Sequence, residues 1–328
     1  MPAQFRLKVL VPLVLLAATS LAACGDSDGS GEASSSPAAR HAAADKIIAQ
    51  AVGVNPAARS GRIDGSILLH IRGVPRFEGP IELTANGFYD LPDGADVPDL
   101  DVDVSVALRG GVLGGSIVVK DGTGYIKLGD TGYKLPDAVS RALVAPARKA
   151  KNGLTKTGAM FYINPQDWQT DAELVGDEQV AGEPTQKITA KIRADRAFLD
   201  LDRLVRFLAL LHVPQAVGLP TKLGPEVRAA LVRSVTLAKG EVWMGKDDHV
   251  MRQAHLVGKG VVSKRDQKLL YGATGATIDA TLNMSEVGDP HPISAPTRLD
   301  PYANLQLSLN ALAEAIRNDV TSAKEQAK

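Results

Sequence analysis

The chain offers six histidines as candidate bases or metal ligands, and their spacing indicates neither role. None lies in an H-x-x-x-H or H-E-x-x-H pattern, which would place two zinc ligands on one helix face. Partners for a histidine base can still meet in space, so that alternative stays open here. We expect the histidines to be scattered over the surface and the sheet edges, and we predict no metal and no cofactor. The six are His41, His70, His212, His249, His255 and His291.

Three other short patterns match known site motifs only in part. Gly25–Gly29 (GDSDG) has the G-x-S-x-G spacing of serine hydrolases but lies in a polar segment rather than on a strand-to-helix turn. Gly110–Ser116 has the glycine spacing of a P-loop without its lysine, and we expect a hairpin turn there. Asp99, Asp101 and Asp103 share a strand face but lack the glycine turn and later glutamate of a calcium loop, so a solvated sheet face is expected. We predict that the protein is not an enzyme.

The single cysteine, Cys24, directly follows Leu21-Ala22-Ala23. A lone thiol excludes an intramolecular disulfide framework and a multi-thiolate metal or iron–sulfur site. The four residues resemble the bacterial lipobox, in which the cysteine thiol is diacylglycerylated and the cysteine then becomes the new N-terminus. The alternative is an ordinary signal with a chance cysteine. Because the only cysteine falls at the cleavage point, we predict that Cys24 is acylated and anchors the chain to a membrane.

The residues before Cys24 have the pattern of an export signal. Arg6 and Lys8 form a short positive region, and an apolar run from Val9 to Ala23 follows. That run is shorter than the roughly 20 residues that a membrane-spanning helix needs. We therefore predict a lipoprotein signal peptide over 1–23 and a mature protein held at the cell membrane, lipid-anchored, on its extracytoplasmic side.

The composition is that of a folded protein without an electrostatic reason to bind nucleic acid. The 328 residues are 45% hydrophobic and 23% charged, with 37 Lys and Arg against 37 Asp and Glu. Removal of Arg6 and Lys8 with the signal leaves 35 against 37, a net charge of −2. Nucleic-acid binding needs a basic excess or a basic face, so no nucleic-acid partner is predicted.

Residues 24–44 are predicted to form a lipidated flexible tether. Gly25–Ala44 contains 15 Gly, Ser, Ala or Pro residues in 20 and no branched aliphatic or aromatic side chain. Such a segment buries too little surface to fold, and random-coil scaling gives it a reach of about 25 Å. A helix is expected from about Asp45 to Val52.

Beyond the tether, apolar residues alternate with polar ones as in an antiparallel sheet. The clearest case is Leu100–Leu108, in which Leu100, Val102, Val104, Val106 and Leu108 share one face. Hairpin signals at Asp121-Gly122 and Asp130–Gly132 join the strands that follow. Further strands are expected at 66–73, 80–89, 116–120, 124–128, 133–135, 173–178, 185–194, 239–244, 250–262 and 276–287.

Helices are expected at 137–151, 199–212 and 225–234 and, after a proline-rich passage, from Pro301 onward. The helix at 199–212 is apolar over more than half of its circumference, and such a helix must be covered on two sides. The second cover is either a bound apolar molecule or the helix at 225–234, and the pattern does not choose between them. Aromatics make up only 4% of the chain, so the inward positions are mainly aliphatic, which suits acyl chains better than sugars or nucleotides.

Several segments together resemble the LppX/LprAFG lipoproteins of mycobacteria and relatives, in consistent order over residues 45–287. These segments are Leu21–Cys24, Tyr125–Leu128, Phe161–Trp168, Val180–Thr185 and Gly240–Met244 followed by Arg252. The resemblance implies an α+β fold, a U-shaped antiparallel half-barrel with helices across its concave face and an apolar cavity between them. It also implies a carrier of lipids or lipoglycans without catalytic residues. A helical extension at 300–328 and a longer middle region depart from the family pattern.

We therefore expect a half-barrel lipid-binding domain over 45–289, followed by a proline-rich linker and C-terminal amphipathic helix over 290–328. The expected function is to bind a multi-acyl lipid or lipoglycan and to carry or present it in the cell envelope, with a membrane transporter as a further partner. The alternative is an envelope scaffold or sensor that binds a protein and carries no lipid. The expected cavity lining comprises Val102, Val104, Val106, Ile188, Ile192, Leu204, Phe207, Leu208, Leu211, Ile278 and Leu282.

Overall fold

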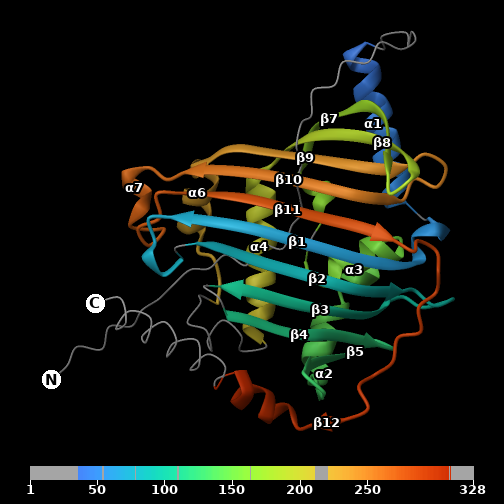
Figure 1. Ribbon diagram of the computed structural model, residues 1–328, viewed down its shortest axis with the longest axis vertical. Helices are drawn as coiled ribbons and strands as arrows, with labels where there is room; N and C mark the ends of the chain where they lie inside the picture. Colours follow the sequence, from blue (N-terminus) through green and yellow to red (C-terminus); the bar gives the residue numbers. More distant parts are fainter. Residues whose placement is uncertain are drawn as a thin grey trace.

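The computed structural model describes residues 36–309 and 311, except 54, 78, 109, 110, 163 and 211–220. Within this part of the chain, one twelve-stranded sheet runs in the order β12-β6-β5-β4-β3-β2-β1-β11-β10-β9-β8-β7 (Figure 1). Its neighbouring strands pair antiparallel except β12 and β6, which pair parallel. The predicted α+β class with one antiparallel sheet spread along the chain is confirmed, in an open sheet.

Eleven strands lie at the predicted places, and most are longer than predicted, whereas β10 and β11 are shorter and β12 was not predicted. Their bounds are β1 (Ser60–Arg72), β2 (Pro80–Asp90), β3 (Asp99–Leu108), β4 (Gly111–Lys120), β5 (Thr123–Leu128), β6 (Thr131–Lys134), β7 (Gln169–Val180), β8 (Glu183–Ile192), β9 (Val235–Gly245), β10 (Met251–Val261), β11 (Gly275–Ser285) and β12 (Leu299–Asp300). The segment 111–116, expected as a hairpin turn, belongs to strand β4. Its glycines give that strand few side chains to pack, which weakened the strand pattern.

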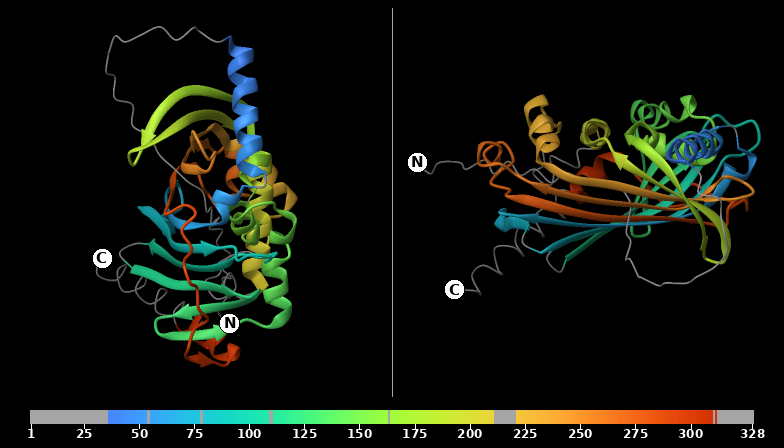
Figure 2. Two further views of the ribbon diagram at one scale, coloured as in Figure 1. Left: turned by 90° about the vertical axis from the view of Figure 1, so that its right-hand side faces the viewer. Right: turned by 90° about the horizontal axis from the view of Figure 1, so that it is seen from above.

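The helices lie on one face of the sheet (Figure 2). Their bounds are α1 (Pro37–Val52), α2 (Asp137–Val144), α3 (Gly153–Met160), α4 (Ala194–Leu210), α6 (Pro225–Ser234) and α7 (Lys264–Gln267). Short 3₁₀ helices occur at Pro56–Arg59, Pro75–Phe77, Ala147–Lys149 and Pro165–Trp168. Residues 302–309 are also helical, in agreement with a helix beginning after Pro301.

Three helix expectations were wrong in their bounds, and one of them is the helix expected from Leu199, which begins at Ala194. The helix expected from Asp45 begins at Pro37, so residues 37–44 of the predicted tether are helical. Ser36 caps this helix, with its hydroxyl accepting from the Ala39 amide at 3.3 Å, and the alanines that follow have high helix propensity. The helix expected over 137–151 ends at Val144, and a separate helix, α3, follows it.

The face that carries the helices is the apolar one. On β3 it holds Leu100, Val102 and Val104, and the strand register continues the same row through Ala85 of β2 and Gly115 of β4. The opposite face of β3 carries Asp101 and Asp103. Asp99, expected on a solvated face, is instead buried and accepts from the Lys120 ammonium at 2.7 Å and the Asp121 amide at 2.9 Å.

Candidate functional site

Helix α4 crosses the apolar face of the sheet (Figure 1). Its sequence is apolar on most sides, and within it Leu201, Leu204, Val205 and Phe207 are all buried. Arg203 is an exposed interruption. The helix therefore requires apolar partners on two sides, as its sequence pattern indicated.

Helix α6 covers the second side of the N-terminal half of α4. Leu201 and Val205 pack with Leu223, and half-buried Val227 and Leu231 of α6 extend this cluster. Of the two covers that the sequence left open, the neighbouring helix is the one found here. A bound apolar molecule is therefore not needed to explain the burial of this half of α4.

Two buried aspartates fix α4 to its neighbours. Asp200 accepts hydrogen bonds from the Trp168 indole and the Asn164 amide, both at 3.0 Å, and pairs with Arg203 at 2.7 Å. Asp202 accepts from the Leu223 amide at 2.6 Å. Because a buried carboxylate is costly without such partners, these contacts hold the N-terminal half of the helix in one position.

The sheet beneath α2, α3 and the C-terminal end of α4 is filled by a large cluster, which we name the central core. Its buried members are Tyr89, Leu100, Val102, Val119, Leu135, Leu143, Val144, Ala147, Met160, Phe207 and Met284. Tyr89 is fully buried, and its hydroxyl has no hydrogen-bond partner. Burial raises the pKa of Tyr89. This part of the interior is therefore packed.

A second cluster on the same face, which we name the hairpin cluster, lies around the turn between β1 and β2. It consists of Ile67, Leu69, Phe77, Ile81, Leu83 and Ala280, with half-buried Ile71, Val74, Val106, Ala276 and Ile278 against it. Among the residues that the structure describes, its members come from strands β1, β2, β3 and β11 and the turn at 74–77. No α-helix in the described ranges contributes to it, in contrast to the central core.

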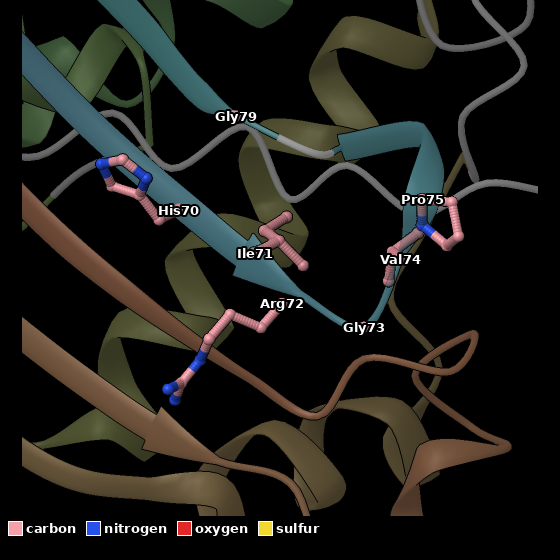
Figure 3. A pocket seen from close by; sticks show the side chains of 7 residues that line it. All are labelled: His70, Ile71, Arg72, Gly73, Val74, Pro75 and Gly79. Atoms are coloured by element: carbon pink, nitrogen blue, oxygen red, sulfur yellow. The ribbon is translucent and has the colours of Figure 1, made fainter. Parts of the chain in front are cut away.

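A half-open pocket of about 410 Å³ lies at the edge of the hairpin cluster (Figure 3). Ile71 and Val74 belong both to the pocket wall and to the hairpin cluster. His70 and Arg72 also line the pocket, and their side chains alternate with that of Ile71 along β1. The pocket thus joins solvent to the apolar side chains at this end of the sheet.

Eight of the eleven expected lining residues fall into three clusters rather than one. Val102, Val104, Phe207, Leu208 and Leu282 belong to or pack on the central core. Val106 and Ile278 pack on the hairpin cluster, and Ile188 is buried beneath α1 with Ile47. Leu204 is buried on α4, Ile192 is half-buried at the end of β8, and Leu211 lies outside the described residues, as does Cys24. The contacts place these residues in separate packed clusters, and their role as a cavity lining stays a prediction.

The polar face carries a buried charged group that sequence reasoning missed. His255 Nδ1 lies 3.4 Å from the Glu241 carboxylate, and Lys187 and Lys239 lie 3.6 and 3.1 Å from the same carboxylate. Burial lowers the pKa of His255 to about 4. Burial alone would raise the pKa of Glu241, but the Lys239 hydrogen bond and the Lys187 charge outweigh it and lower that pKa. Only the β9–β10 register brings this pair together, and no local pattern shows it.

Two further features bear on the kind of site. Within the described ranges, no group of three or more His, Cys, Asp or Glu side chains is arranged to hold a metal ion. None of the described helices has the length and apolar character to span a membrane.

The architecture defines the class as an α+β protein with one large open, mostly antiparallel sheet and helices on its apolar face. Two solved structures are similar to this chain over most of its length. LprF from Mycobacterium bovis is 11% identical, with 78% of this chain and 97% of that chain covered and a TM-score of 0.41. The Mycobacterium tuberculosis lipoprotein LppX is 15% identical, with 77% and 99% covered and a TM-score of 0.38. The resemblance to LppX/LprAFG lipoproteins is thus confirmed as a structural similarity.

A third similar structure is a Pseudomonas aeruginosa MucA/MucB complex, in which the matched chain is 14% identical. The match covers 77% of this chain and 59% of that chain, with a TM-score of 0.30. No family model and no curated protein matches the sequence.

Proposed function

We propose that this protein is a membrane-anchored lipoprotein that binds a multi-acyl lipid or lipoglycan and carries or presents it in the cell envelope. The observation that carries the proposal is the hairpin cluster, an apolar sheet surface to which no described α-helix contributes. Cys24 would hold the mature chain at the membrane through its acyl groups. The cargo would come from the membrane itself or from a membrane transporter.

The acyl chains would lie along the hairpin cluster beside α4, rather than in the packed central core. In this proposal the sheet curves around them as a U-shaped half-barrel. Each methylene moved from water onto such a surface contributes about 0.8 kcal/mol, so partition alone offsets extraction from a bilayer. Because Asp200 and Asp202 fix the N-terminal half of α4, opening would involve its C-terminal end, where Leu210 is half exposed.

The decisive experiment is organic extraction of the purified mature protein followed by mass spectrometry. To separate cargo from the anchor, the protein is made from residue 24 onward without the signal, so that Cys24 is not acylated. We expect an extractable lipid with two or more acyl chains at near-stoichiometric amount. Protein of this form that yields no extractable lipid after purification, and takes up none from lipid vesicles, would contradict lipid carriage.

The anchor has its own test. Full-length protein grown with labelled palmitate is expected to incorporate label and to sediment with membranes, and Cys24→Ser is expected to incorporate none. Labelling of the Cys24→Ser variant would contradict acylation at this residue.

The second candidate is an envelope scaffold or sensor that binds a protein partner, and the packed central core favours it. It predicts a protein without extractable lipid whose apolar exposed residues contact the partner. The extraction experiment separates the two candidates directly.

A further inference from the structure

Five cationic side chains gather at one end of the sheet, beside the pocket. We name them the basic rim: Arg72, Lys259, Lys264, Arg265 and Lys268. All five are exposed. The register of β1 on β11 places Arg72 opposite Gly275, and the register of β10 on β11 places Lys259 opposite Thr277, two residues away.

The basic rim is not neutralised by nearby carboxylates. Residues 259–268 contain four of its cations and one acid, Asp266. Asp266 is buried and paired with Arg233 of α6 at 2.7 Å. In the described part of the chain, no member of the basic rim forms an ion pair within 4.0 Å, whereas Arg203 and Arg206 on α4 are both paired with aspartates.

Large apolar side chains are exposed among these cations. Leu237 is 48% exposed and lies opposite Lys259 on the neighbouring strand, and Val261 is 53% exposed, two residues after Lys259. Tyr271, in the loop after α7, is 41% exposed. Three of the exposed large hydrophobic residues of the described chain therefore lie around the basic rim. Single exposed apolar residues need no explanation, but a group of them indicates an interaction surface.

The basic rim also borders the opening to the apolar interior. Arg72 lines the pocket together with Ile71 and Val74, which reach into the hairpin cluster (Figure 3). An acyl chain that enters the hairpin cluster through this pocket would pass the basic rim. A phosphate or carboxylate on the same lipid would then meet the cations.

Unpaired cations with interleaved aliphatic and tyrosine side chains suit an anionic membrane surface. Lys and Arg side chains near such a surface are attracted by its negative charge, and tyrosine and aliphatic side chains enter the interfacial region. We propose that the basic rim docks the protein on an anionic phospholipid surface, so that the pocket faces the lipid that is taken up or delivered. That lipid is taken up or delivered through the pocket rests on the proposed function, whereas the docking of the basic rim on a membrane does not.

The test measures partition of the unacylated mature chain, residues 24–328, onto vesicles by co-sedimentation. Leaving out residues 1–23 removes no described element. One vesicle type contains phosphatidylglycerol and phosphatidylcholine, and the other contains phosphatidylcholine only. We expect binding to the anionic vesicles and weak binding to the neutral ones. Binding should fall when salt is raised from about 0.1 M to 1 M, because the Debye length falls from about 10 Å to 3 Å.

The test variant is the triple substitution Lys264→Glu, Arg265→Glu and Lys268→Glu. Its matched control is Arg148→Glu, Lys149→Glu and Lys151→Glu, which makes the same charge change at exposed cations on another surface. We expect the first variant to bind anionic vesicles at least about tenfold more weakly, since three contacts of this kind are lost. The control should stay within about threefold of the unchanged protein, as it retains all the rim cations.

Equal losses in the two triple variants would overturn the proposal, because net charge rather than the basic rim would then decide binding. Equal binding to the two vesicle types would overturn it as well. Vesicle binding and lipid extraction are separate readouts: extractable lipid without anionic vesicle binding would overturn the docking and leave the proposed function standing. Binding to anionic vesicles that depends on the basic rim, in a protein without extractable lipid, would support the docking and contradict the proposed function.

Discussion

At the scale of single residues, the least expected feature is a histidine that burial keeps neutral. His255 is 2% exposed, its Nε2 has no hydrogen-bond partner, and its Nδ1 faces the Glu241 carboxylate. Glu241 is also shared by Lys187 and Lys239, which face the same site from β8 and β9. Protonation of His255 would therefore add a charge with little water around it.

The resulting pH dependence has a defined sign. The pKa of His255 is about 4 in the folded protein against 6.5 ordinarily, so the unfolded chain binds the proton more readily. The contribution of neutral His255 to the free energy of unfolding is complete above pH 6.5. As the pH falls toward 4 this contribution is lost, and the loss reaches up to about 3 kcal/mol. Chemical unfolding at several pH values should show a shallower slope in His255→Gln over this window. Exposed His70→Gln should keep the original slope, and an unchanged slope in His255→Gln would exclude this origin.

The buried aspartate of α4 gives a second prediction at this scale. In Asp200→Ala, the Trp168 indole and Asn164 amide lose their acceptor while remaining buried or partly buried. We expect the free energy of unfolding to fall by about 3 kcal/mol, because buried donors without partners carry a desolvation cost. Asp195→Ala, an exposed acid in the first turn of the same helix, should cost less than about 1 kcal/mol. Similar losses for the two variants in urea unfolding would contradict the assigned role of Asp200.

At the scale of elements, the beginning of α1 shortens the segment that the sequence predicted to be a tether. Helix α1 packs on the edge strand β7, where His41 Nδ1 lies 2.5 Å from the Ala172 carbonyl oxygen and Arg40 pairs with Glu173 at 2.6 Å. Strand β7 is at the edge of the sheet, and these contacts cover part of that edge. Only 12 residues then separate Cys24 from Pro37, and as a flexible chain they would reach about 20 Å rather than the 25 Å expected for the longer tether.

A glycine contact between β2 and β3 gives the prediction for this scale. A Cβ on Gly87 would lie 2.0 Å from the Asp101 carbonyl oxygen and 2.7 Å from the Val102 Cα. Gly87→Ala must therefore displace one strand from its neighbour, and we expect a loss of about 1–3 kcal/mol in unfolding free energy. Gly114→Ala, whose Cβ would meet nothing closer than 3.7 Å, is the matched control and should be close to neutral. Equal effects in thermal unfolding would contradict the close approach at Gly87.

The same elements show what the sequence determines. The alternation at Leu100–Leu108 located β3 and its apolar face because burial of one sheet face imposes that period. Helix α3 was missed because its start depends on an Asn152–Thr155 capping box within a stretch that has no apolar period. The anchors of α4 were missed for another reason: Trp168 and Leu223 lie far from Asp200 and Asp202 in the sequence, and only tertiary packing joins them.

At the scale of the whole molecule, zero net charge conceals an uneven distribution. The chain has as many acids as bases, yet residues 259–268 hold four cations and one acid. A net charge of zero excluded a protein that is basic overall, but it did not exclude a local excess of cations at one end of the sheet. The order of strands and helices predicted a single sheet, whereas strand register decided where the cations, the pocket and the hairpin cluster meet. Register over sheets of this length depends on long-range packing that local patterns do not contain.

For the lipid carriage proposed above, that arrangement predicts where lipid binding can be weakened without unfolding the protein. Val74 is half-buried, lines the pocket and packs on the hairpin cluster. Val74→Asp would place a carboxylate where an acyl chain enters, and a charge on an apolar binding surface disfavours the chain as well as the anionic group of its lipid. We expect at least about tenfold less co-purified lipid by mass spectrometry, with a far-UV circular dichroism spectrum unchanged.

The control is Val175→Asp, which makes the same substitution at a 55% exposed valine on β7, away from the pocket. It should retain the lipid content of the unchanged protein. If both variants keep their lipid, entry does not occur at Val74, and the contact surface must be sought on another part of the apolar face. If both lose it, the effect follows from added charge rather than from the pocket, because only Val74 touches the hairpin cluster.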